Sequence, residues 1–100
     1  MNIHINPELE FEFLPRISGK EKKALKEDIE QNGQKVKGIV ASDGSIIEGR
    51  NRFEICNELK REFFYEIDKT LDTLEKQKIV VIVMNLLRRH LTTEQKYDAY

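Results

Sequence analysis

The chain has 100 residues, 39% of them hydrophobic and 35% charged, with 5 glycines and 2 prolines. This composition is typical of one soluble globular domain, and it excludes a disordered, collagen-like or membrane-spanning chain. The net charge is −1, from 17 basic and 18 acidic side chains. Strong DNA binding by these residues alone is therefore excluded, because such binding needs a basic excess to neutralise phosphates.

The first part of the chain predicts an extended segment followed by a helix. Residues 1–17 contain two prolines and alternate apolar with polar side chains, which is typical of extended backbone. Ser18 and Glu21 have the spacing of a capping box, and Gly33 supplies a stop signal. We therefore expect an amphipathic helix over residues 19–31.

The middle of the chain predicts a hairpin, a helix and a further strand. Asp43 and Gly44 stand between two short runs rich in β-branched residues, 38–41 and 45–48, which is a strong hairpin signal. Residues 50–60 then favour a helix with an apolar face. Aromatic and branched residues over 63–67 predict another strand.

Two structures compete for residues 72–90. The run 79–83 has strand propensity, but the whole stretch lacks a turn residue, and so long an apolar segment favours a buried helix. A second capping-box spacing predicts a last helix from about residue 93. Because the chain ends within that helix, we expect residues 1–100 to be a single domain excised from a longer protein.

The first candidate site is the turn from the second hairpin strand into the next helix, and we call Gly49, Arg50, Asn51 and Arg52 the 49–52 turn. The N–H groups of a first helical turn attract an anion, and glycine lets an oxyanion approach the backbone. Arginines there oppose the helix dipole, which a bound phosphate would offset. Spacing alone supports equally well an alternative in which the arginines pair with surface glutamates, namely Glu48, Glu54 and Glu58.

The second candidate lies at the end of the long helix and consists of Asn85, Arg88 and Arg89. Guanidinium groups match phosphate oxygens bidentately. The residues alone favour the alternative, in which basic side chains in a last helical turn complement the dipole and cap carbonyl groups.

The sequence gives little support for a metal site, a reactive cysteine or a membrane location. It contains no Walker A loop, HExxH or CxxC motif, and neither histidine has a partner at metal-ligand spacing, so no metal site is predicted. Cys56 lies on an apolar helix face, which indicates packing, and a lone cysteine fits a reducing cytoplasm. The longest apolar run, 79–84, is far shorter than the roughly 20 residues of a membrane helix, so no membrane partner is expected.

Four short strings of the sequence, which include both candidate sites, resemble in their order and spacing the ParB N-terminal domain family, most closely its phage and mobile-element branch. The resemblance runs from about residue 14 to the end and rests on four strings: Asn32-Gly33-Gln34, Gly38-Ile39-Val40, the run 43–52 with its GRNR, and the run 85–92 with its RRHLT. It implies the ParB/sulfiredoxin fold of the α/β (α+β) class, in which helices surround a small mixed sheet.

The resemblance also implies roles for particular residues. In ParB proteins the block that matches the 49–52 turn grips the phosphates of CTP, and the block that matches Asn85, Arg88 and Arg89 contacts the triphosphate and its metal. Gly33 and Gln34 match the start of the block that frames the base and ribose. The implied ligand is therefore a nucleoside triphosphate, with CTP as the first candidate.

The sequence departs from the family pattern at several positions. Lys37 and Gly38 replace the proline of the first block, and GRNR replaces the more usual GERR. Met84 stands where the family has an acidic residue that helps to hold Mg²⁺, and Leu87 replaces a glutamine. These changes count against Mg²⁺ binding and CTP hydrolysis. Arg50 replaces the cysteine that sulfiredoxin activity requires.

The leading hypothesis is a nucleotide-responsive domain of a DNA-partition or DNA-regulatory protein. Ligand binding would reorder the terminal helix and favour a homodimer, and DNA would be bound by a C-terminal region beyond residue 100. The alternative is a ParB-like nuclease or phosphotransferase domain, or a weak CTPase, with Glu48 as a catalytic base or metal ligand. A third possibility is a scaffold that mediates protein contacts only.

Overall fold

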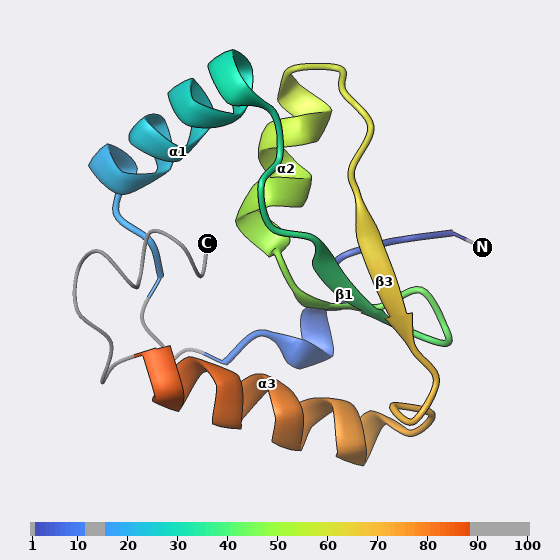
Figure 1. The fold of residues 1–100 in the computed structure, drawn as a ribbon. Helices are drawn as coiled ribbons and strands as arrows, with labels where there is room; N and C mark the ends of the chain where they lie inside the picture. The colour runs from blue at the N-terminus through green and yellow to red at the C-terminus, as the bar shows by residue number, and fades with distance from the viewer. Residues whose placement is uncertain (1, 12–15, 89–100) are drawn as a thin grey trace.

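The computed structural model describes residues 2–11 and 16–88. In chain order they form η1 (Pro7–Leu9), α1 (Gly19–Asn32), β1 (Gly38–Ala41), β2 (Ile46–Glu48), α2 (Arg50–Glu58), β3 (Tyr65–Asp68) and α3 (Leu74–Arg88) (Figure 1). The predicted class, a mixed α+β domain with helices around a small mixed sheet, is confirmed. The helix expected from residue 93 lies outside the described residues.

The sheet has the strand order β2-β1-β3. β1 pairs antiparallel with β2 through the predicted hairpin, and it pairs parallel with β3. A parallel pair requires a crossover connection, and the segment that contains α2 supplies it. The β1–β2 register shifts between two pairs, Val40 with Ile46 and Ile39 with Glu48, so Ile47 is an extra residue that forms a bulge.

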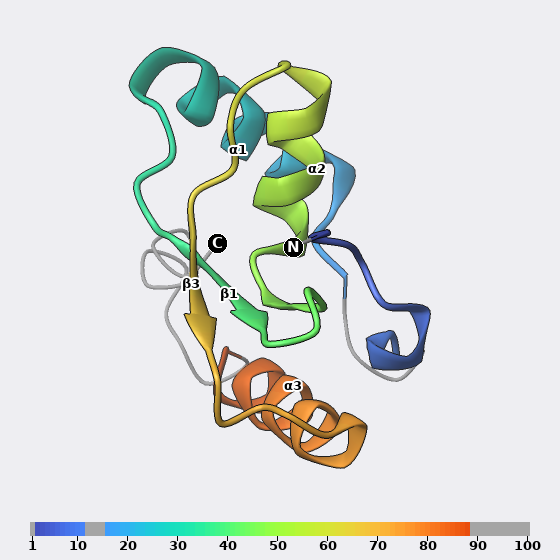
Figure 2. The ribbon, with the colours of Figure 1, turned by 90° about the vertical axis from the view of Figure 1, so that its right-hand side faces the viewer.

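Helices cover both faces of the sheet, α1 and α2 on one side and α3 with η1 on the other (Figures 1 and 2). The first core cluster contains Leu25, Ile29, Val40, Ile46, Ile55, Cys56 and Phe63. The second contains Leu9, Ala41, Ile47, Leu71 and Val81. Successive β1 side chains enter opposite clusters, as the pleat of a strand requires. Cys56 is 1% exposed, so the prediction that it packs in the core is confirmed.

The signals predicted for α1 are the ones that the structure uses. Ser18 Oγ accepts a hydrogen bond from Glu21 N at 3.1 Å, and the hydroxyl donates to Glu21 Oε1 at 3.1 Å. Gly33 ends the helix at φ 80°, a conformation that favours glycine, and its N–H donates to Ile29 O at 2.8 Å.

The helical alternative for residues 72–90 is confirmed over α3. Thr73 Oγ1 accepts a hydrogen bond from Lys76 N at 3.3 Å and so caps the first turn. Within residues 2–11 and 16–88, no helix combines the length and the apolar character needed to cross a lipid bilayer.

Two expectations need correction. Residues 1–17 were expected to be extended throughout, but Pro7 begins a 3-10 turn, because proline is tolerated at the first position of a helix and Asn6 Oδ1 caps Glu8 N at 3.0 Å. The strand expected at 63–67 is shifted to β3, because the Gln34 side chain takes up both backbone groups of Phe64.

Candidate functional site

The 49–52 turn begins α2 in the way that the sequence indicated. Gly49 is the N-cap at φ 101°, in the left-handed region. A Cβ there would lie 3.1 Å from Gly38 Cα and 3.2 Å from Arg52 Nη1, so both conformation and space require glycine. As a glycine, the N-cap residue has no side chain with which to cap the helix. The N-cap residue therefore contributes no carboxylate or hydroxyl oxygen to the N–H groups of the first turn of α2.

Arg50 already contacts two carboxylates. Its Nη1 lies 2.9 Å from Glu10 Oε1, and its Nε lies 3.4 Å from Glu54 Oε1. The alternative of pairing with a nearby glutamate is thus confirmed for Glu54, one helical turn away. The contact with Glu10 was not predicted, because 40 residues separate the two and the sequence between them carries no signal for it.

These pairs belong to a larger ionic cluster. The second oxygen of Glu10 lies 3.4 Å from Arg16 Nη2, and the second oxygen of Glu54 lies 3.6 Å from Lys22 Nζ. Each carboxylate thus bridges two cations. We call Glu10, Arg16, Lys22, Arg50 and Glu54 the Arg50 cluster. It contains three cations and two carboxylates, so it retains a net positive charge.

Arg52 occupies a different environment from Arg50. Its side chain is 2% exposed and lies beneath Gly49, whereas the Arg50 side chain is 35% exposed. Residues two apart on a helix point in different directions, which explains the separation. Burial lowers the pKa of Arg52 to about 10, so the guanidinium remains charged at neutral pH. Asn51, between them, is half-buried.

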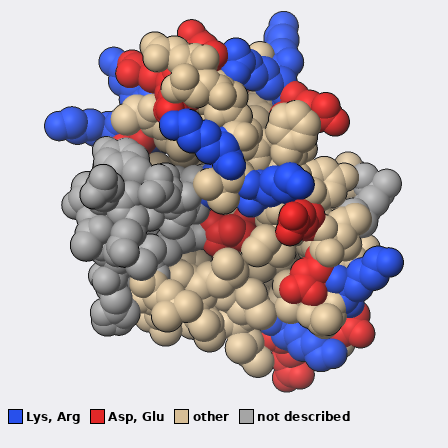
Figure 3. All heavy atoms as spheres, in the orientation of Figure 1, with Lys and Arg blue, Asp and Glu red and all other residues tan. Residues whose placement is uncertain are grey.

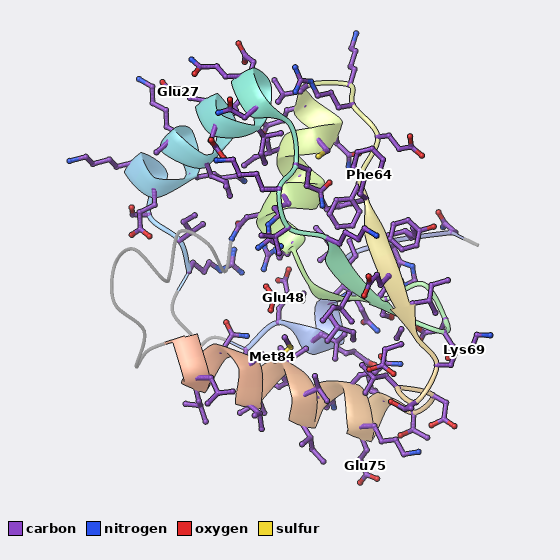
Figure 4. The ribbon with its side chains drawn as sticks, viewed as in Figure 1. Glu27, Glu48, Phe64, Lys69, Glu75 and Met84 are labelled. Atoms are coloured by element: carbon purple, nitrogen blue, oxygen red, sulfur yellow. The ribbon has the colours of Figure 1, made fainter. Side chains whose placement is uncertain are left out.

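Glu48 lies at the end of β2, directly before the turn. It is opposite Ile39, whose side chain packs on the α3 side of the sheet, and the bulge at Ile47 turns Glu48 toward that side. Figure 4 shows Glu48 between the start of α2 and α3. Among the described residues, no group of three or more His, Cys, Asp or Glu side chains has an arrangement that could hold a metal ion.

The second candidate block is described only in part. Met84, one residue before Asn85, packs against the second core cluster, which contains residues of β2 and α3. Asn85 Nδ2 donates to Val81 O at 2.7 Å, within α3. Arg88 is the last residue of α3, and Arg89 lies outside the described residues.

Gly33 and Gln34 lie away from the 49–52 turn. They line a cavity of about 270 Å³ near the C-terminal end of α2, together with Ile29, Cys56, Arg61, Glu62 and Phe64. A helix of 9 residues is about 13 Å long, so the cavity and the turn lie near opposite ends of α2. The Gln34 amide is engaged with the protein: Nε2 donates to Val36 O at 2.9 Å and Phe64 O at 2.7 Å, and Oε1 accepts from Phe64 N at 2.8 Å.

Arg61 is a structural residue that sequence reasoning missed. Its guanidinium donates to the carbonyl groups of Ile29 and Glu30, the latter at 2.7 Å, and so caps the last turn of α1. A cation at a helix C-terminus is favoured by the dipole. No local pattern could reveal the contact, because about 30 residues separate the partners.

The fold and the site define a small mixed α+β domain in which a glycine N-cap and a cluster of arginine and lysine side chains lie at the start of α2. Comparison of the chain with family models, with curated proteins and with solved structures finds no match.

Proposed function

We propose that this chain is a ParB-like nucleotide-responsive domain, which binds the phosphates of a nucleoside triphosphate at the 49–52 turn, with CTP as the first candidate. The observation that carries the proposal is the contact between Arg50 Nη1 and the Glu10 carboxylate at the start of α2. This guanidinium is positioned to hold an anionic oxygen, and the oxygen of a phosphate would form the same charge-assisted bond.

Three further features support an anion at this place. Gly49 removes the side chain that would block an approach to the backbone. The dipole of α2 is positive at this end, and the N-cap residue, Gly49, has no side chain with which to offset it. Arg52 remains charged beneath the turn and adds to the positive potential without needing to touch the ligand.

The proposed setting is a DNA-partition or DNA-regulatory protein in which DNA is recognised by a C-terminal region and the ligand favours a homodimer. The net charge of −1 supports a regulatory role rather than a DNA-binding surface. Figure 3 shows basic and acidic side chains of the described residues interspersed on one face of the molecule. Sedimentation velocity with and without CTP tests the dimer, because a ligand that closes a dimer raises the sedimentation coefficient.

Isothermal titration tests the proposed ligand. We expect heat of binding with CTP and weaker or no binding with ATP, GTP and UTP, each titrated with and without Mg²⁺. Arg50→Gln should weaken binding about tenfold or more, since a charge-assisted bond to phosphate is lost. Lys35→Gln is the matched control, because Lys35 pairs with Asp28 on α1 and its loss removes the same charge elsewhere. The absence of heat with all four nucleotides at millimolar concentration would refute the proposal.

A further inference from the structure

A carboxylate of the chain itself occupies the side of Arg50 that a ligand would need. Glu10 Oε1 lies 2.9 Å from Arg50 Nη1, and Glu10 Oε2 lies 3.4 Å from Arg16 Nη2. The two oxygens of one carboxylate are therefore shared between two guanidinium groups that come from distant parts of the sequence. Phosphate oxygens are recognised by arginines in the same manner.

We propose that Glu10 is a built-in competitor of the anionic ligand, so that a phosphate group binds at Arg50 by displacing the Glu10 carboxylate. This inference rests on the proposed function and adds a mode of regulation to it. The ligand and Glu10 then compete for one guanidinium, and ligand affinity is set by the difference in their free energies of binding to Arg50. The free protein is held in the Glu10-bound state.

The Arg50 cluster allows this exchange without dismantling α2. Glu54 Oε1 lies 3.4 Å from Arg50 Nε and Glu54 Oε2 lies 3.6 Å from Lys22 Nζ, so Arg50 retains one carboxylate neighbour when Glu10 leaves. The side chains of Arg50 and Glu10 are 35% and 31% exposed. Because solvent reaches both groups, the ion pair is weak enough for a multiply charged ligand to replace it.

Displacement of Glu10 would also affect the packing of η1 against α3. Glu10 ends η1, where its N–H donates to Pro7 O at 3.1 Å. The adjacent Leu9 is 7% exposed and packs in the same core cluster as Val81 of α3. A ligand that pulls Glu10 away therefore acts on the contact between η1 and α3, the helix that carries the second candidate block.

The test compares the wild type with Glu10→Gln and with the matched control Glu8→Gln. Both variants remove one negative charge from the same 3-10 turn, but Glu8 forms no ion pair with any described residue. We expect Glu10→Gln to bind CTP and inorganic tripolyphosphate about three to ten times more tightly than the wild type, because the competing anion is gone. The affinity of Glu8→Gln for both ligands should stay within about twofold of the wild-type affinity. This difference measures the general effect of removing one negative charge.

Amide hydrogen exchange provides a second readout that a change in charge alone would not move. CTP should speed exchange at the amides of Leu9 and Glu10, which close η1, in the wild type. In Glu10→Gln these amides should exchange rapidly before CTP is added. In Glu10→Asp, whose side chain is one methylene shorter, these amides should exchange at a rate between those of the wild type and Glu10→Gln. This variant replaces Glu10→Gln in the test if Glu10→Gln fails to fold.

The possible failures are distinguishable. Equal affinities of Glu10→Gln, Glu8→Gln and the wild type would refute the competitor and leave nucleotide binding intact. Unchanged exchange at η1 on CTP binding would refute the displacement. If neither CTP nor tripolyphosphate binds any of these chains, the proposed function itself is refuted, and the competitor with it.

Discussion

The side chain of Gln34 pairs with the backbone of Phe64 as a neighbouring strand would. Its Nε2 donates to Phe64 O at 2.7 Å, and its Oε1 accepts from Phe64 N at 2.8 Å. Gly38 N also donates to Phe64 O, at 3.0 Å, at the point where β1 and β3 begin to pair. Gln34 thus fixes the entry into β3, and this role differs from the ligand contact that the family resemblance implies.

Gln34→Ala should therefore act on stability rather than on ligand affinity. The substitution removes two hydrogen bonds to the backbone of Phe64, and because both are exposed to solvent we expect the free energy of unfolding to fall by about 1–2 kcal/mol. Urea denaturation measures the loss, and Gln31→Ala is the control, because Gln31 is exposed on α1 and should change stability by about 0.5 kcal/mol or less. A tenfold loss of CTP affinity at unchanged stability would instead support the ligand contact.

Gly49 should tolerate no side chain. Gly49→Ala forces an L-residue into φ 101° and brings a Cβ to 3.1 Å from Gly38 Cα, which is backbone and cannot turn aside. Backbone strain of this kind costs about 1–3 kcal/mol, and the steric contact adds to it. Thermal unfolding of the variant should show the loss as a lower midpoint.

Gly19→Ala is the matched control for this prediction. Gly19 has no atom within 4 Å of a Cβ position and begins α1 without a positive φ. Because alanine restricts the unfolded chain and favours the helix, we expect a neutral effect or a gain of up to about 1 kcal/mol. Equal losses from the two substitutions would contradict the role assigned to Gly49.

Asp43 should make the stability of the hairpin turn depend on pH. The hydrogen bond from Ser45 N to Asp43 Oδ1, at 2.9 Å, holds the pKa of Asp43 below its ordinary value of 3.8, and Gln77 Nε2 adds a bond at 3.4 Å. A lowered pKa in the folded state gives stability that is fully present above pH 3.8 and is lost as the pH falls through the lowered pKa.

Asp43→Asn tests that sign. The variant should be less stable than the wild type at pH 7, and the difference should shrink as the pH falls below about 4, because the wild-type carboxylate then becomes neutral too. Urea midpoints measured between pH 7 and pH 2 give the two curves. The control is Ser42→Ala, in the same turn, which changes no titratable group. Its urea midpoint should differ from that of the wild type by a constant amount over this pH range. A constant difference between Asp43→Asn and the wild type would contradict the prediction.

Local signals predicted the elements of this fold well, and long-range contacts escaped prediction. Ser18 and Glu21 locate the start of α1, and Asp43 with Gly44 locates the hairpin, because each signal acts within a few residues. The contacts of Arg50 with Glu10 and of Gln34 with Phe64 join residues that are 30 or more positions apart. Such contacts depend on how the elements pack, and no pattern of spacing encodes that packing.

The same reasoning explains what the sequence could say about the candidate site. The 49–52 turn was recognised because glycine, a strand end and a helix start are adjacent in the chain. The different environments of Arg50 and Arg52 follow from helical geometry, which turns residues two apart in different directions. Which of the two would be buried depended on how α2 packs on the rest of the fold, and so it required the structure.

α3 provides a direct test of the choice between helix and strand. Val81 is 6% exposed in the core, and Val83 is 47% exposed. In a strand these two side chains would share a face, whereas on a helix they point apart. Val81→Ala should therefore lower the free energy of unfolding by about 1–3 kcal/mol through lost packing. Val83→Ala should change it by no more than about 0.5 kcal/mol, because alanine also has the higher helix propensity. Urea denaturation of both variants measures the contrast, and similar losses at the two positions would contradict the helical orientation.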